Sequence, residues 1–153
     1  MLRIPVMGFG FHREKRILQV LVAVAGLVPI AAGVWGVVHG FAGGLAGEPA
    51  SLLNHERYLS GLLAAIGLGF WTAIPGIEAR TGRIRLLTTL VVVGGLSRLL
   101  GVAMGDGLTF ATVGPLVMEL IVTPALCLMQ SRLAYAAGHE LPANRLPIGE
   151  AMG

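Results

Sequence analysis

Two charged residues inside apolar stretches are the strongest candidates for chemistry in this sequence. Arg98 interrupts the apolar run 86–104, and Glu119 lies near the start of the run 115–133. A lone charge within such a helix is costly and is a functional-site hypothesis by default. At about 1.5 Å per helical residue, Arg98 lies roughly 9 Å from the end of its helix, and Glu119 roughly 6–9 Å from the start of the next. Opposite charges at matching depth on consecutive helices are expected to pair.

Arg57 and Tyr58 begin another apolar run and extend this candidate site. Together with Arg98 and Glu119 they would form a polar recess at one end of the helices. Two arginines against one carboxylate leave spare positive charge, which suits an anionic head group or a partner's carboxylate. Two alternatives stay open. The Arg98–Glu119 pair can be a structural clasp that sets helix register, and Arg57 and Tyr58 can be interfacial anchors.

Other reactive side chains show no pattern of a cofactor or metal site. The sequence has no phosphate loop, dinucleotide fingerprint, nucleophile elbow or paired histidines at helical spacing. His39, His55 and Glu56 lack a fixed ligand spacing. The single cysteine, Cys127, lies in apolar surroundings typical of an inert thiol. We therefore expect no cofactor and no metal, and we favour a non-enzymatic role while leaving catalysis open.

The composition indicates a membrane protein. Of the 153 residues, 55% are hydrophobic and only 12% are charged. A soluble domain carries about twice that charged share. A chain this short leaves much of its surface exposed, so a large core does not explain the deficit, and lipid must cover the apolar surface. The basic residues cluster between long uncharged runs, a pattern typical of membrane orientation and not of nucleic-acid binding.

The helices that must position these residues follow from four apolar runs. Each run is close to the ~20 residues that a helix needs to cross ~30 Å of hydrocarbon. In lipid the backbone must satisfy its own hydrogen bonds, so the runs are predicted to be helices. The fold class is therefore an all-α, integral membrane four-helix bundle. The expected helices are 17–38, 58–77, 86–104 and 115–133 within a domain 17–134, between an N-terminal segment 1–16 and a flexible tail 135–153.

Charge distribution predicts the orientation. Basic residues cluster in the N-terminal segment, in the loop 78–85 and after the fourth run, whereas the first and third loops are nearly free of them. Basic residues stay cytoplasmic. We therefore place both termini in the cytoplasm of a bacterial cell, with the recess facing the periplasm from the inner membrane.

The first apolar run also has features of a secretory signal peptide. Basic residues 12–16 precede it, and residues 43–47 form a weak cleavage site. Its apolar part is about 22 residues long, however, against the usual 7–15 of a signal peptide. We expect it to be retained as a membrane helix.

Small residues recur at helical spacing and predict close packing between the helices. Within the apolar runs, the polar side chains of Thr72, Thr123 and Gln130 are expected to find hydrogen-bond partners on the backbone or on neighbouring helices. The small-residue stripes are Gly26, Gly33, Gly36 and Gly40; Gly61, Ala65, Gly69 and Ala73; and Gly94, Gly101 and Gly105.

The sequence resembles the bacterial membrane proteins grouped as domain of unknown function 4345. The resembling segments are Arg57-Tyr58-Leu59-Ser60-Gly61, Gly94-Gly95-Leu96-Ser97-Arg98-Leu99-Leu100 and Met118-Glu119-Leu120. The resemblance implies four inner-membrane helices and an arginine–glutamate pattern at Arg57, Arg98 and Glu119. It implies no reaction. Similar small membrane proteins are associated with envelope properties and phage susceptibility.

Two functional hypotheses follow. The first is an accessory or envelope-associated protein that works with the bilayer or a larger membrane complex. The alternative is a binding protein, carrier or enzyme for a lipid-like or anionic ligand held by Arg57, Tyr58, Arg98 and Glu119. A channel or transporter is less favoured, because the charged pair is off-centre and no internal repeat is visible.

Overall fold

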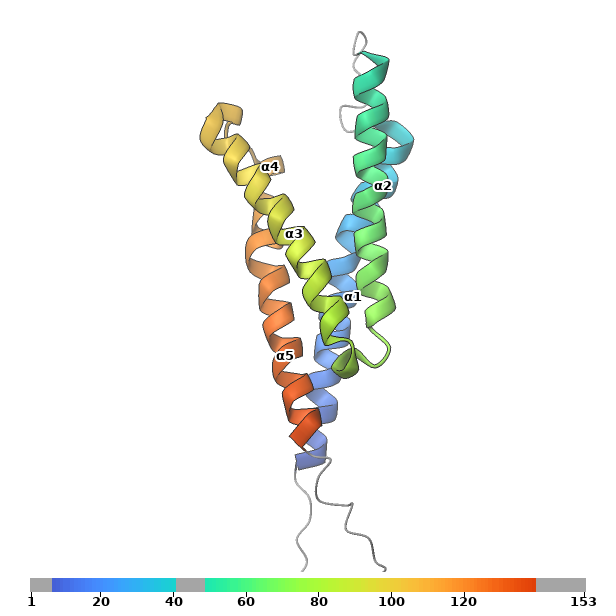
Figure 1. Ribbon diagram of the computed structural model, residues 1–153, viewed down its shortest axis with the longest axis vertical. Coiled ribbons are helices and arrows are strands. Elements are labelled where there is room, and N and C mark those ends of the chain that lie inside the picture. The colour runs from blue at the N-terminus through green and yellow to red at the C-terminus, as the bar shows by residue number, and fades with distance from the viewer. Residues whose placement is uncertain (1–6, 41–48, 140–153) are drawn as a thin grey trace, which may run out of the picture.

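The chain folds into helical rods, and the computed structural model describes residues 7–40 and 49–139 (Figure 1). Its elements are α1 (Met7–His39), α2 (Ala50–Ala73), η1 (Ile77–Ala79), α3 (Thr81–Gly101), η2 (Val102–Asp106), α4 (Phe110–Val117), η3 (Met118–Val122) and α5 (Thr123–His139). Helix α3 runs on into η2, and α4, η3 and α5 follow one another without a break. The chain thus forms four rods, and the predicted all-α, four-helix class is confirmed. The weak cleavage site at 43–47 and the tail beyond His139 lie outside the described residues.

Three of the rods are long and apolar enough to cross a membrane: Gly10–His39, Thr81–Asp106 and Phe110–Gly138. Helix α2, with 24 residues, is long enough but is not among these three, and Asn54-His55-Glu56-Arg57 make its first half polar. It starts earlier than the predicted run 58–77 and ends earlier, at Ala73. Pro75 follows, and Gly76 has a φ of 66°, so the chain leaves the helix there and turns into η1.

The rods are arranged as two arms (Figure 1). Helices α1 and α2 lie side by side in one arm, and α3 lies with α4 and α5 in the other. The arms meet at the end of the molecule that holds the start of α1, the α2–α3 connection and the end of α5. We call this end the base. The arms diverge toward the opposite end, which we call the tip and which holds the end of α3, η2 and the start of α4.

Glycines bring α1 and α2 close together, as predicted for Gly26 and Gly33. A Cβ added to Gly33 would lie 2.6 Å from both the Ala64 amide nitrogen and the Ser60 carbonyl oxygen. Small residues permit such backbone contact. On α2, however, the contact positions are Ser60, Ala64 and Gly67. The predicted position Gly61 lies one residue away and faces only the Val37 side chain, at 3.9 Å.

The hydrophobic core is at the base, where the two arms meet. Its buried residues come from three elements: Leu18 and Val22 of α1, Ile77 of η1 and Leu133 of α5. Side-chain amides hold the α2–α3 connection in this core, because Gln19 donates to the Ile74 carbonyl at 2.9 Å and Gln130 donates to the Ile77 carbonyl at 2.8 Å. The α2–α3 connection is therefore hydrogen-bonded to both arms, to α1 through Gln19 and to α5 through Gln130.

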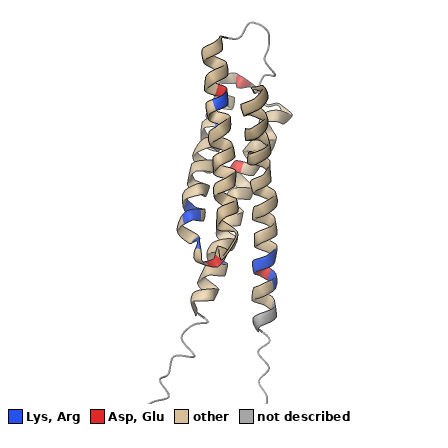
Figure 2. Cartoon of the chain, turned by 90° about the vertical axis from the view of Figure 1, so that its right-hand side faces the viewer, with Lys and Arg blue, Asp and Glu red and all other residues tan. Residues whose placement is uncertain are grey.

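Charged positions gather near the ends of the rods, with mostly uncharged ribbon between them (Figure 2). The base carries Arg13, Lys15, Arg16, Glu78, Arg80, Arg83, Arg85 and Arg132. Few charges lie on the apolar segments between base and tip. This layered distribution is typical of a chain whose middle lies in hydrocarbon.

Candidate functional site

Arg98 of α3 and Glu119 of η3 form an ion pair. Arg98 Nε donates to Glu119 Oε2 at 3.3 Å, and Arg98 Nη2 donates to Glu119 Oε1 at 3.3 Å. Both carboxylate oxygens therefore accept from one guanidinium, the two-point geometry that arginine offers to a carboxylate. The two side chains lie toward the tip, on consecutive rods of one arm.

Gly95 determines how close the two rods come at this pair. A Cβ on Gly95 would lie 2.9 Å from Glu119 Cβ and 2.8 Å from Leu120 Cδ2. Gly94, which the predicted stripe included, has nothing within 4 Å of its added Cβ. The contact face of α3 is therefore rotated by one residue, about 100°, from the predicted face.

A widened helical turn presents Glu119. Residues Met118–Val122 are π-helical, and the Thr123 amide bonds the carbonyl of Met118, five residues back. The Thr123 hydroxyl donates to the same carbonyl at 2.8 Å. Pro124 follows and has no N–H, so it cannot continue the ordinary ladder. Such π-turns are frequent at functional sites.

The ion pair is unequally exposed. The Arg98 side chain is 42% exposed, whereas the Glu119 side chain is 17% exposed. A guanidinium has five N–H donors, and only two of those on Arg98 bond a described residue. Three donors of Arg98 therefore remain for a group from outside the described chain.

An apolar groove adjoins the pair. It has a volume of about 230 Å³ and is lined by Leu99, Leu108, Val113, Leu116, Val117, Leu120 and Ile121. Leu99 follows Arg98 in the chain, and Leu120 follows Glu119. Gly95, Arg98 and Leu99 share the side of α3 that meets η3. The ion pair and the groove thus both lie at the contact between α3 and η3.

The structure does not bring Arg57 and Tyr58 to this pair. Both residues lie in the first half of α2, which belongs to the other arm and diverges from α3 toward the tip (Figure 1). Tyr58 is exposed, and its ring lies 6.4 Å from that of His55. The Arg57 side chain makes no hydrogen bond within the described segments.

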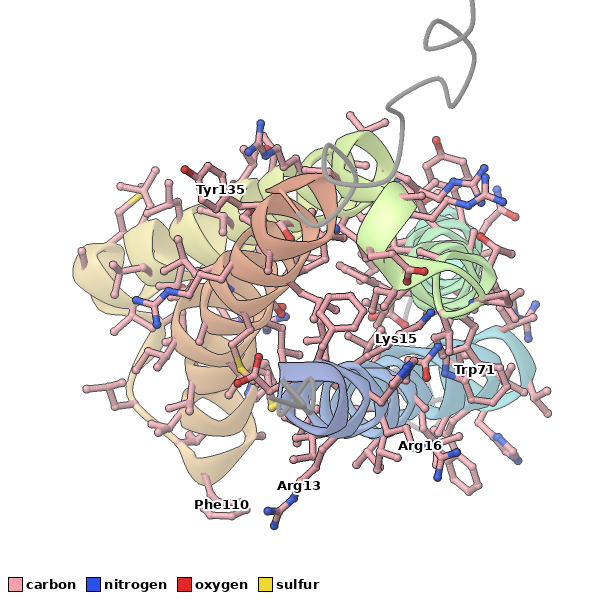
Figure 3. All side chains as sticks on the ribbon, turned by 90° about the horizontal axis from the view of Figure 1, so that it is seen from below. Arg13, Lys15, Arg16, Trp71, Phe110 and Tyr135 are labelled. Carbon is pink, nitrogen blue, oxygen red and sulfur yellow. The ribbon has the colours of Figure 1, made fainter. Side chains whose placement is uncertain are left out.

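A second ion pair, at the base, was missed by the sequence reasoning. Lys15 Nζ donates to Glu78 Oε1 at 2.7 Å, and each side chain is about one quarter exposed. From below, Lys15 points toward the connection, whereas Arg13 and Arg16 point away from the bundle (Figure 3). The hydrogen bond from Lys15 lowers the pKa of Glu78 below its ordinary value of 4.5, against a smaller opposing effect of burial. The one available signal was that Lys15 is the single lysine among eleven basic residues.

The remaining candidates behave as small polar groups of a helix bundle. The Thr72 hydroxyl donates to the Gly69 carbonyl at 2.7 Å, and Cys127 is a free, partly buried thiol. The predictions for Thr72 and Thr123 are confirmed. For Gln130 the prediction holds for the amide nitrogen, which donates to the Ile77 carbonyl and to Thr81 Oγ1, but not for Oε1, which is buried and accepts from no described residue. Within residues 7–40 and 49–139, no cluster of three or more metal-ligating side chains occurs.

Comparison with known proteins gives one match. The family described as Domain of unknown function (DUF4345) matches residues 17–130, which is most of the chain and includes both members of the Arg98–Glu119 pair. Neither the curated proteins nor the solved structures include a significant match.

Proposed function

The chain belongs to the family described as Domain of unknown function (DUF4345), and we propose that it is a multi-pass membrane protein that binds a phospholipid at the Arg98–Glu119 pair. In this proposal the base, with its arginines, lies in the cytoplasm and the tip faces the periplasm of a bacterial inner membrane. The phosphate lies against Arg98, and one acyl chain lies in the adjoining apolar groove.

The proposal rests on the exposure and the unbonded N–H donors of the Arg98 guanidinium. It is half-exposed, and only two of its donors are bonded within the described chain. Unsatisfied donors in hydrocarbon cost several kcal/mol each, in the range of about 2–7. A phosphate is the acceptor that a lipid environment supplies, and arginine is well suited to it because its planar donors match phosphate oxygens.

Binding, and not catalysis, is what the geometry of the pair supports. Both oxygens of Glu119 accept from Arg98, so this carboxylate is engaged by the pair, and no second acid or base group of the described residues is bonded to it. The groove contributes apolar surface only. A charged end and an apolar wall together favour an amphiphile over a small polar solute.

The proposal is tested by the lipids that the protein retains. The protein would be extracted with its surrounding lipid, and bound phospholipid would be quantified for the wild type and for Arg98→Leu combined with Glu119→Leu. We use the double variant because removing one partner alone leaves an unpaired charge that can prevent folding. Arg57→Leu is the matched control, since Arg57 is an arginine outside the pair.

We expect the double variant to fold and to lose at least about tenfold in retained phospholipid, equivalent to about 1.4 kcal/mol of binding free energy. The Arg57→Leu control should retain phospholipid at the wild-type level. Equal retention by the wild type and the double variant would refute the proposal.

A second function is that of an accessory subunit of a larger membrane complex. Exposed apolar side chains at the tip favour it. Phe110 is 96% exposed and Met104 is 79% exposed, and large exposed apolar side chains of this kind are available for contact with proteins or lipid. Photo-crosslinking from position 110 in native membranes tests this function. A discrete protein adduct supports a partner, whereas adducts to lipid alone contradict it.

A further inference from the structure

Exposed arginines surround the base of the molecule. They come from α1, α3, α5 and the α2–α3 connection: Arg13, Arg16, Arg80, Arg83, Arg85 and Arg132. Among the described residues, only Thr72 accepts a hydrogen bond from one of them, Arg83. Lys15 and Glu78 neutralise each other, so Glu14 is the one further carboxylate at the base within residues 7–40 and 49–139. The base therefore carries an excess of positive charge.

These arginines lie near one level along the rods. Lys15 bonds Glu78, and Gln130 bonds both Ile77 and Thr81, so these positions of α1, the connection, α3 and α5 lie side by side. Each arginine is within four residues of one of them in the chain, which is at most about 6 Å along a helix. A lipid headgroup layer is roughly 5–8 Å thick. The arginines therefore form a band that matches the depth of one headgroup layer.

Apolar surface starts directly beside this band on the outer face of α1. Arg13, Arg16 and Val20 follow one another at spacings of three and four residues, so they share this face. Seen from below, Arg13 and Arg16 point away from the bundle (Figure 3). Val20 is 60% exposed, and Leu27, seven residues further on, is 51% exposed. The face thus has a charged end that continues into an apolar strip.

Trp71 of α2 adds an aromatic ring to this strip. Its indole Nε1 donates to the Ala23 carbonyl of α1 at 3.0 Å, and the residue is 40% exposed. Ala23 lies seven residues after Arg16, on the same side of α1 and about 10 Å nearer the tip. Figure 3 shows Arg16 and Trp71 on the same side of the bundle. The indole therefore lies where the acyl chain of a lipid held by Arg16 would run.

We propose that this outer face of α1, from Arg13 to the Trp71 contact, binds an anionic phospholipid. The planar donors of Arg13 and Arg16 match phosphate oxygens, and the apolar strip accommodates the acyl chain. An anionic headgroup is preferred because basic clusters at the end of a membrane helix attract negative lipid, whereas a zwitterionic headgroup brings an ammonium that the excess positive charge repels. This site rests on the membrane-spanning part of the proposed function, and not on lipid binding at the Arg98–Glu119 pair.

Fluorescence quenching of Trp71 tests this site. With Trp35→Phe, the full chain keeps Trp71 as its single tryptophan. It is reconstituted into phosphatidylcholine vesicles that contain acyl-brominated phosphatidylglycerol or acyl-brominated phosphatidylcholine in both leaflets, since bromine quenches a neighbouring indole. We expect phosphatidylglycerol to bind beside Trp71 at least about threefold more strongly than phosphatidylcholine. About 0.5 M salt should reduce this preference, because salt screens exposed charges.

Substitutions on α1 locate the preference. Arg13→Gln combined with Arg16→Gln should lower it to about one, whereas Arg13→Lys combined with Arg16→Lys should retain it because the charge is kept. Arg57→Gln removes an exposed arginine of α2 far from the base and is the matched control, which should keep the preference. Equal quenching by the two lipids in the wild-type background would overturn the proposal. An undiminished preference in the glutamine variant, or an equal loss in Arg57→Gln, would do the same.

The double variant Arg98→Leu with Glu119→Leu separates this site from the one at the tip. Its net charge is that of the wild type, and the preference measured at Trp71 should persist whatever lipid the tip retains. Loss of the Trp71 preference in this variant would contradict an independent site at the base. Circular dichroism verifies that each variant is folded.

Discussion

Gly95 lies directly under Glu119, so close that a Cβ on Gly95 would come within 2.9 Å of Glu119 Cβ. This approach of α3 to η3 places the guanidinium of Arg98, one turn further along α3, within reach of the carboxylate. The ion pair therefore depends on a residue that has no side chain. The same contact seats Leu120, which lines the apolar groove.

Gly95→Ala should destabilise the fold and disturb the pair. Its Cβ meets Leu120 Cδ2 at 2.8 Å as well as Glu119, and overpacking of this kind costs about 1–3 kcal/mol. Thermal unfolding in detergent, monitored by circular dichroism, measures this loss of stability. Gly94→Ala, with nothing within 4 Å of the added Cβ, is the control and should be neutral or stabilising. Equal effects of the two substitutions would contradict this packing.

Gly33→Ala should separate α1 from α2. The added Cβ would meet backbone atoms of Ser60 and Ala64 at 2.6 Å, and backbone cannot move aside as a side chain does. We expect a loss of stability larger than that of Gly95→Ala. Gly61→Ala, which meets only a Val37 methyl group at 3.9 Å, should be tolerated. Tolerance of Gly33→Ala would show that the helices are not in backbone contact there.

The helical architecture was predictable because apolar length and charge spacing are one-dimensional properties. Arg98 and Glu119 could be matched by counting residues from the loop between them. The direction in which a helix faces is harder to derive, since an error of one residue rotates the contact face by about 100°. For this reason Gly94 was predicted where Gly95 makes the contact, and Gly61 where Ser60 and Ala64 do.

Arg57 and Tyr58 illustrate a different difficulty. Their depth was compatible with a shared recess, but depth does not say which arm a helix joins. Helix α2 packs on α1 through glycines, and its first half diverges from α3. The η3 turn and the Lys15–Glu78 pair depend on tertiary contacts that a single sequence does not reveal, although Pro124 marks where an ordinary helix must be disturbed.

Low pH should destabilise the fold at the end of the molecule that holds Glu78. Because the pKa of Glu78 in the fold lies below its ordinary 4.5, its ion pair with Lys15 stabilises the fold above that pH. This stabilisation is lost as the pH falls through the lowered pKa. Unfolding measured from pH 7 to pH 3 should therefore show a larger loss of stability for the wild type than for Glu78→Gln.

Glu14→Gln is the control for that experiment, because Glu14 is exposed on α1. Its stability profile should follow that of the wild type. If Glu78→Gln also loses stability in parallel with the wild type, Glu78 does not contribute to the acid sensitivity.

Removing one partner of the Arg98–Glu119 pair should be worse than removing both. Glu119→Leu leaves Arg98 without its carboxylate, and Arg98→Leu leaves Glu119 as an unpaired charge of low exposure. A lone charge in hydrocarbon is costly, whereas two leucines fit an apolar surface. Unfolding free energies of the two single variants and the double variant, compared as a double-mutant cycle, check this expectation. Additive effects would mean that the two side chains do not interact in the membrane.

The most direct test of lipid binding is the distance between phosphate and Arg98. Solid-state NMR with ¹⁵N-labelled arginine in phospholipid bilayers measures dipolar coupling between lipid ³¹P and guanidinium nitrogen. Because every arginine carries the label, the Arg98 signal is identified as the one lost in Arg98→Lys. We predict strong ³¹P coupling on that signal, at the close approach of a hydrogen-bonded phosphate, and its persistence in Arg57→Lys. An Arg98 signal without ³¹P coupling in the folded protein would contradict the account.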